Sequence, residues 1–157
     1  YLPPIVVLSG LLDHLLFMVP VLAMVLLHGY FPSWSWLQLL YYAGSLCVFL
    51  SGVTYLVSAT SVFFPDLSHA TGVVGRVLFY FSPVIWDIEL IPTELQRIVR
   101  LNPLYYTVVG YRDAFFSGTP FWDKPFLTLY FWTWTVVILA VGRFAFRRLR
   151  PQFADLI

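Results

Sequence analysis

Long apolar runs separated by short polar breaks dominate the pattern of this chain. We expect membrane spans at about residues 5–28, 37–64, 68–86 and 126–142, because about 20 consecutive apolar residues are needed for a helix to cross a bilayer. In lipid such runs satisfy their backbone hydrogen bonds as helices. The pattern therefore predicts an all-α, polytopic membrane protein with four spans in this chain.

Residues 87–123 interrupt that pattern before the last expected span. They include Arg97, Arg100 and Arg112, and a charged side chain at the bilayer centre costs at least about 2.5–3.5 kcal/mol. We therefore expect this segment to lie at the membrane surface or to re-enter it as a helical hairpin. Below, residues 87–123 are called the hairpin.

Local signals divide the hairpin into two short helices. Thr93 and Gln96 have the spacing of a capping box, and the residues after them alternate as in an amphipathic helix. Asn102 before Pro103 predicts a break and the start of a second helix, which Gly118 would end. At about 22 Å, that helix would be too short to cross a hydrocarbon core of about 30 Å.

The composition excludes an ordinary soluble domain. Hydrophobic residues make up 60% of the chain and charged residues 11%, against about 25% charged residues in soluble proteins. The net charge of +1 gives no argument for nucleic acid. The single cysteine, Cys47, excludes an intrachain disulfide framework and a cysteine-rich metal site. Since the chain starts at Tyr1 without a visible signal peptide, we expect a fragment of a longer protein.

Polar residues inside the first two spans each allow two interpretations. Asp13 and His14 would carry protons or touch substrate, or would form a polar pair near an interface or a hydrogen bond to a neighbouring helix; the second interpretation is favoured. The second span carries small residues at steps of three and four, which favour close helix packing over a polar pathway. This stripe consists of Gly44, Cys47, Ser51, Thr54, Ser58 and Ser61, with Gly52 and Ala59 beside it.

Basic residues at the end of the last span predict the orientation. Arg143, Arg147, Arg148 and Arg150 lie in the tail 143–157, and the positive-inside rule places that tail in the cytoplasm. The hairpin and the loop 28–36 would then face outward. Residues 65–72, with Asp66 and His69, would form an inward-facing polar loop, and they lack the further ligands that a metal site needs.

The order of several short motifs resembles the membrane permease of ABC-type polysaccharide exporters, most closely the wall teichoic acid exporters of Gram-positive bacteria. The motifs are Ser82-Pro83-Val84, Asn102-Pro103-Leu104, Tyr111-Arg112-Asp113 and the closing run from Arg147 to Leu156. A member of that family would have six spans, two of them before Tyr1. One departure is Pro65-Asp66-Leu67, where the family usually shows Arg-Asp-Leu.

The resemblance implies a homodimer in the bacterial plasma membrane, with each copy docked on an ABC ATP-binding subunit. A lipid-linked anionic glycopolymer, teichoic acid or a related polymer, would pass from the cytoplasmic side to the cell surface. The hairpin would act as an outer gate and residues 65–72 as an inner coupling loop. The implied gate residues are Arg97, Arg100, Asn102, Pro103, Arg112 and Asp113; the implied coupling residues are Asp66, Leu67 and His69.

The energy for transport would come from the partner subunit. The chain has no phosphate-binding loop of the form GxxxxGK[ST], so we expect no cofactor here and ATP with Mg²⁺ on the ATP-binding subunit. No catalytic site is expected in this chain, and translocase activity would belong to the complex.

Aromatic residues are candidates for the substrate pathway because their faces stack on sugars. The candidates are Tyr41, Tyr42, Phe79, Tyr80, Tyr105, Tyr106, Tyr130 and Trp132. For any one cluster, packing or an interfacial belt is the favoured alternative. The hairpin arginines would meet phosphate or pair with Glu94 or Asp113.

Other functions fit parts of the pattern. A permease for O-antigen or capsule would carry the same class of lipid-linked polymer. A membrane-embedded transferase would use His14 or His69 with Asp13 or Asp66, but acid–base catalysis needs its groups within hydrogen-bond reach of one substrate. A scaffold subunit is the third alternative.

Overall fold

The computed structural model describes residues 2–64 and 66–149, and these contain helices and short connections without a β-strand. The α-helices are α1 (Leu2–Leu27), α2 (Gln38–Thr60), α3 (Asp66–Tyr80), α4 (Thr93–Arg100), α5 (Pro103–Arg112) and α6 (Pro125–Leu149). Shorter helical turns are η1 (Trp34–Leu37), η2 (Ile88–Leu90), η3 (Asp113–Ser117) and η4 (Phe121–Asp123).

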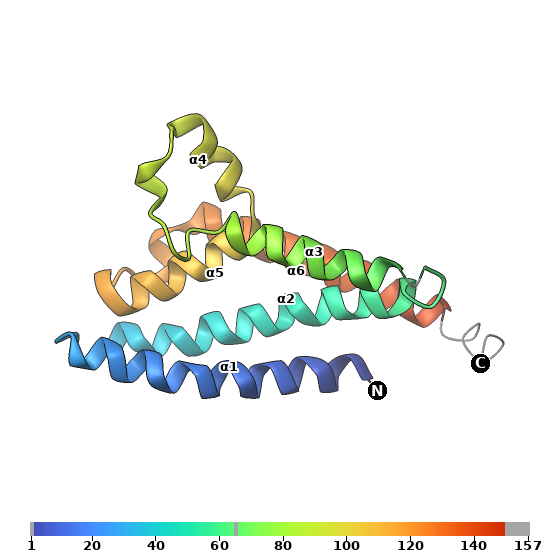
Figure 1. Ribbon diagram of the computed structural model, residues 1–157, viewed down its shortest axis with the longest axis horizontal. Helices are drawn as coiled ribbons and strands as arrows, with labels where there is room; N and C mark the ends of the chain where they lie inside the picture. Colours follow the sequence, from blue (N-terminus) through green and yellow to red (C-terminus); the bar gives the residue numbers. More distant parts are fainter. Residues whose placement is uncertain (1, 65, 150–157) are drawn as a thin grey trace.

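The long helices run side by side, with α2 between α1 and α6, and α4 stands off the side of this bundle (Figure 1). The start of α1 and the end of α6 lie at one end of the bundle, and the loop after α1 lies at the other. At that second end, Ser35 Oγ donates to the carbonyl of Ala114 at 2.9 Å. The last part of the hairpin and the loop 28–36 therefore lie together, as the sequence predicts.

The helical, polytopic fold is confirmed. Among the described residues, three helical segments are long and apolar enough to cross a membrane: Pro4–Leu27, Trp34–Thr60 and Pro125–Leu149. The expected span at 68–86 is shorter than predicted, because α3 has 15 residues, or about 22 Å. It ends before Pro83, whose ring cannot continue a helix.

The prediction of a polar loop at residues 65–72 is wrong for residues 66–72, which the structure describes. α3 already begins at Asp66, whose carboxylate in the first turn favours a helix start through the helix dipole. The polar side chains that suggested a loop, Asp66 and His69, are exposed on the helix, as is Leu67 between them. Polar composition alone did not separate a loop from an exposed helical turn.

Small residues bring α2 and α6 into close contact. A Cβ atom added to Gly142 would lie 2.5 Å from the carbonyl oxygen of Gly52, and one added to Gly52 would lie 2.8 Å from the backbone nitrogen of Leu139. A Cβ at Gly44, in the predicted stripe, would meet nothing within 4 Å. Close packing is therefore confirmed, but the residues beside the stripe provide it.

Asp13 and His14, the polar pair of α1, lie in different environments. His14 Nε2 and the Tyr111 hydroxyl share a hydrogen bond of 2.8 Å, which joins α1 to α5. Asp13 is exposed. For His14, the structure supports the interpretation as a hydrogen bond to a neighbouring helix. Burial raises the pKa of Tyr111 to about 12, so its hydroxyl stays neutral in this bond.

Candidate functional site

One amide side chain joins the end of α3 to the start of α5. Asn102 Nδ2 donates to the Leu78 carbonyl at 2.8 Å and to Ser82 Oγ at 2.9 Å, and Asn102 Oδ1 accepts from the Leu104 amide at 3.0 Å. Ser82 Oγ also donates to the Leu78 carbonyl at 2.9 Å. Asn102 thus satisfies a backbone acceptor near the end of one helix and a donor at the start of the next. We call these four residues the Asn102 junction.

The predicted boundaries of the second hairpin helix are confirmed. Asn102 is the N-cap of α5, and Pro103 occupies its first turn. α5 continues as the π-helical turn η3, which ends at Gly118 with a left-handed backbone, φ +67°. A residue without a Cβ adopts that conformation with little strain.

The predicted capping box at the start of α4 is wrong. Pro92 is the N-cap and makes no side-chain capping bond, while Thr93 is already helical. Gln96 Nε2 instead donates to the Ile91 carbonyl at 3.1 Å. Because Pro92 precedes the helix with its φ fixed, α4 begins one residue earlier than a Thr93 cap would allow.

Arg112 ties the end of α5 to the loop that follows α3. Its Nη1 donates to the carbonyls of Pro83 and Trp86 at 3.3 and 3.4 Å. Its Nη2 lies 3.7 Å from the Asp87 carboxylate. Both charged side chains are about half exposed, so the carbonyl contacts locate the guanidinium more firmly than this ion pair. Arg112 therefore pairs with Asp87, and not with Asp113 or Glu94.

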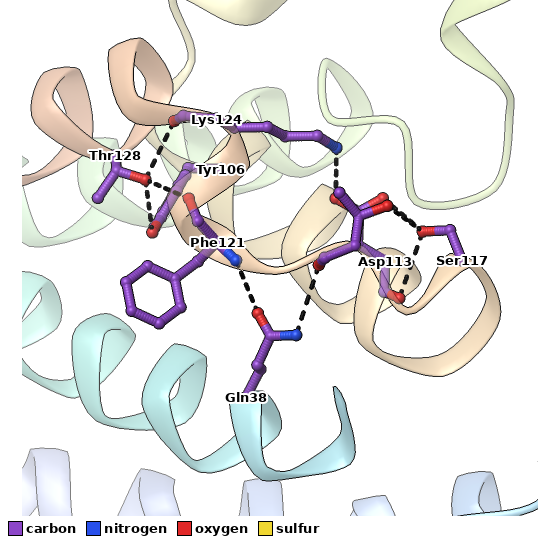
Figure 2. Close-up of polar contacts among 8 residues, drawn as sticks. Gln38, Tyr106, Asp113, Ser117, Phe121, Lys124 and Thr128 are labelled. Atoms are coloured by element: carbon purple, nitrogen blue, oxygen red, sulfur yellow. Dashed lines mark hydrogen bonds and ion pairs between the residues drawn. The ribbon is translucent and has the colours of Figure 1, made fainter. Parts of the chain in front are cut away.

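A second polar group attaches the end of the hairpin to α2 and α6 (Figure 2). The Phe121 amide donates to Gln38 Oε1 at 2.8 Å, and Gln38 Nε2 donates to the Thr119 carbonyl at 3.4 Å. Asp113 forms an ion pair with Lys124. Since Gln38 is only 9% exposed, its amide satisfies backbone groups that would otherwise be buried without partners.

Thr128 extends this group to the aromatic residues. Its Oγ1 lies 3.2 Å from the Tyr106 hydroxyl and 3.1 Å from the carbonyls of Phe121 and Lys124. Gln38, Lys124 and Thr128 were missed as site residues from the sequence. Gln38 carried a usable signal, an amide within an apolar run, because polar residues inside membrane segments are often functional or bonded.

Four of the predicted pathway aromatics gather in the core between α2, α5 and α6. Tyr41 OH lies 3.0 Å from Tyr106 OH, and Trp132 Nε1 donates to Tyr41 OH at 2.8 Å. Tyr42 meets Tyr106 edge-on with ring centroids 5.4 Å apart. Tyr42 and Tyr106 are 3% and 5% exposed. Within this chain these rings pack against one another, and their role in a pathway stays a prediction.

The other predicted aromatics are dispersed. Tyr105 is buried, and its pKa is raised by that burial. Tyr130 OH donates to the Leu101 carbonyl at 2.7 Å, which supports the turn between α4 and α5. Phe79 and Tyr80 are 46% and 64% exposed on α3. Of the predicted set, these last two offer the most accessible ring faces.

The remaining predicted site residues lie on exposed surfaces at two separate places. Arg97 and Arg100 are exposed on α4, whereas Val99 is buried. Asp66 and His69 lie in the first turns of α3, at the far end of that helix from the Asn102 junction. In the part of the chain that the structure describes, no three His, Cys, Asp or Glu side chains form a group that could hold a metal ion.

Comparison with known proteins identifies the family. Residues 1–116 match the family described as ABC-2 type transporter. The chain is 28% identical over 154 residues to the O-antigen export system permease protein RfbA of Klebsiella pneumoniae, and a second such protein of that organism is 27% identical. The protein of the same name from Myxococcus xanthus is 25% identical over 158 residues.

These alignments take in 97–99% of this chain but only 58–60% of the relatives. The chain thus spans less than two thirds of the length of the curated proteins it matches. The family match extends over most of the chain, from the first spanning helix through η3. The chain therefore belongs to the ABC-2 type transporter family.

Proposed function

We propose that this chain is part of the membrane permease of an ABC exporter for a lipid-linked polysaccharide of the O-antigen class. The observation that carries the proposal is the similarity to O-antigen export permeases over nearly the whole chain. It supports the O-antigen alternative better than the teichoic acid cargo that the sequence motifs suggested. An ABC ATP-binding subunit would supply the energy, and a second copy of the permease would complete the pathway.

The proposed gate is the hairpin, and its attachments support that role. The Asn102 junction binds it to the end of α3, Arg112 binds it to the loop that follows α3, and Gln38 binds it to α2. α4 itself stands away from the bundle. The hairpin is thus attached both near α3 and at α2. Its exposed Arg97 and Arg100 carry charges that suit the phosphates of a lipid-linked polymer.

We propose α3 as the connection between the inner coupling residues and the gate. Asp66, Leu67 and His69 lie in its first turns, and Leu78, in its last turn, belongs to the Asn102 junction. The helix is continuous between them over 15 residues. A displacement produced by the ATP-binding subunit at the start of α3 would therefore reach the hairpin through a rigid element.

We place the end of α6 in the cytoplasm. Arg147 and Arg148 lie in its last turn, and positive residues beside a span favour the cytoplasmic side. The hairpin and the loop 28–36 would then face outward, because they contact each other at the end of the bundle opposite that turn.

Reconstitution of the full-length permease with its ATP-binding subunit tests the function. We expect lipid-linked O-antigen to stimulate ATP hydrolysis several-fold, with a variant of the partner lacking its phosphate-loop lysine as the inactive control. Parallel samples would contain lipid-linked capsular polysaccharide and lipid-linked wall teichoic acid. Stimulation of hydrolysis by teichoic acid alone would contradict the cargo class, and a lack of stimulation by every polymer would contradict the export function.

A further inference from the structure

α3 carries a cationic side chain that has no anionic partner among the described residues. Arg76 is exposed, and within residues 2–64 and 66–149 it forms no ion pair. Its Nε donates to the Gly72 carbonyl, one turn earlier in the same helix, at 3.2 Å. The side chain of Arg76 therefore lies back along α3 toward Asp66, and it does not extend toward the hairpin end of the helix.

This guanidinium lies deep within the spanning part of the bundle. α3 runs along the long helices (Figure 1). At the end of α3, Leu78 bonds Asn102, and the carbonyl before Asn102 accepts from Tyr130, five residues inside the 25-residue helix α6. Gly72 lies six residues before Leu78, so the guanidinium is about 16 Å below the hairpin end of α6, which is about 37 Å long. Arg76 thus places its charge near the middle of the membrane.

Two other polar side chains share the face of α3 that carries Arg76. At about 100° per residue, His69, Arg76 and Tyr80 lie within about 40° of one another around the helix and extend over about 16 Å of its length. In the part of the chain that the structure describes, the His69 ring and the Tyr80 hydroxyl make no hydrogen bond, and both residues are exposed. A polar stripe on a membrane-embedded helix is expected to face water or a polar partner.

The depth of Arg76 selects among anionic partners. Phospholipid phosphates remain at the surfaces of a hydrocarbon core about 30 Å thick, so they do not reach the middle of α3. A phosphate that is carried across the membrane does pass this depth. With Nε bonded to Gly72, both Nη groups of Arg76 are available as a pair of donors for two phosphate oxygens.

We propose that Arg76 binds the phosphate groups of the lipid-linked polymer while they cross the membrane. Tyr80, one turn further along the same face and 64% exposed, presents its ring to the adjoining sugar. Gly72 and Gly75 keep the space beside the guanidinium open, since a Cβ on either would meet nothing within 4 Å. This inference rests on the proposed export function and names a residue that recognises the cargo.

Reconstitution of the full-length permease with its ATP-binding subunit tests this contact. One O-antigen glycan is supplied on a lipid diphosphate and, in parallel, on the corresponding lipid monophosphate. We expect half-maximal stimulation of ATP hydrolysis in the wild type at an about tenfold lower concentration of the diphosphate form, and a preference of about twofold or less in Arg76→Gln. Arg143→Gln is the matched control, because Arg143 is also exposed but lies on α6; it should keep the wild-type preference.

The outcomes separate this inference from the proposed function. A wild-type complex that neither form stimulates would overturn the export function and this inference with it. Stimulation of the wild type without a preference, or with a preference that Arg76→Gln retains in full, would overturn this inference alone. An equal loss of affinity for both forms, together with a lower unfolding temperature in the absence of polymer, would assign Arg76 to a carboxylate of another protein segment.

Thiol labelling gives a second test that does not depend on the assembly of Arg76→Gln. In a cysteine-free permease, Gly72→Cys lies about 40° around the helix from Arg76, and Gly75→Cys lies about 100° away as the matched control. We expect the anionic reagent sulfonatoethyl methanethiosulfonate to modify Gly72→Cys at least about tenfold faster, and excess lipid-linked O-antigen to slow that reaction. No reaction at Gly72→Cys, as expected if lipid or another helix covers this face, would overturn the proposal, and so would a reaction that the polymer does not slow.

Discussion

At the scale of single residues, Asn102 illustrates how one side chain can organise a re-entrant segment. Its amide contacts backbone groups near the end of α3 and at the start of α5. It is 8% exposed, so water replaces these bonds poorly. A buried polar group left without a partner costs about 1–3 kcal/mol.

We expect Asn102→Ala to lower the free energy of unfolding by about 1–3 kcal/mol, because the Leu78 carbonyl and Leu104 amide lose their partner. Asn102→Asp keeps an acceptor for Leu104 but directs a buried carboxylate oxygen at the Leu78 carbonyl, so it should be no more stable than Asn102→Ala. Thermal unfolding of the purified protein in detergent measures both. Thr93→Ala is the control, since Thr93 makes no side-chain capping bond; an equal loss in this control would contradict the argument.

Arg112 supports a prediction about transport. We expect Arg112→Glu to reduce export about tenfold or more while dimerisation is kept, because a carboxylate would face the carbonyls of Pro83 and Trp86 and the Asp87 carboxylate. Polysaccharide at the cell surface measures export, and crosslinking of the copies measures dimerisation. Arg112→Lys retains the charge but lacks the two guanidinium nitrogens that contact the carbonyls and the Asp87 carboxylate, so it should keep an intermediate activity. Normal surface polymer in Arg112→Glu would refute this role.

At the scale of elements, the contact between α2 and α6 depends on two glycines that face each other. Gly52 and Gly142 allow the backbones to approach so closely that a Cβ on either would collide with the opposite helix. Phe131 and Thr135, on the same side of α6, are fully buried. Small residues at membrane helix interfaces permit this kind of packing.

This contact predicts an order of stabilities. We expect Gly52→Ala to destabilise the protein by about 1–3 kcal/mol through overpacking, and Ser51→Leu to cost less. Ser51 is half-buried, and its hydroxyl bonds only the Cys47 carbonyl of its own helix. Unfolding temperatures in detergent compare the two variants with Gly44→Ala, which has open space. A greater loss of stability in Ser51→Leu than in Gly52→Ala would contradict this order, and would indicate that the predicted stripe with Ser51 makes the close contact.

At the scale of the whole molecule, the bonds of the hairpin determine which loops share an end of the bundle. Gln38 and Ser35 attach residues 114–121 beside the start of α2. The basic last turn of α6 lies at the opposite end. Once the last turn of α6 is assigned to one side of the membrane, the loops at the opposite end of the bundle are assigned to the other side.

Cysteine labelling of intact cells tests that orientation in a Cys47→Ser background. We expect Arg100→Cys to react with an impermeant maleimide from outside, and Arg147→Cys to react only after the membrane is opened. Ser33→Cys, at an exposed position in the loop 28–36, is the outward control. Labelling of Arg100→Cys from the cytosolic side alone would contradict both the topology and the gate.

The sequence predicted the local features of the site well and its partners poorly. The break at Asn102-Pro103 and the stop at Gly118 follow from backbone requirements that nearby residues meet. The capping box at Thr93 failed because Pro92 set the helix start instead. The bonds from Asn102 to Leu78 and from Gln38 to Phe121 join residues 24 and 83 positions apart, and no local pattern specifies such pairs.

The sequence by itself determined the helical, membrane-spanning character and the interruption by the hairpin, because hydropathy and helix boundaries are properties of neighbouring residues. Only the tertiary structure decided that Tyr41, Tyr42 and Tyr106 form a packed core and that Gly52 faces Gly142. These features depend on which helix faces come together. Since these spans are apolar over most of their surface, periodicity alone does not select among their faces.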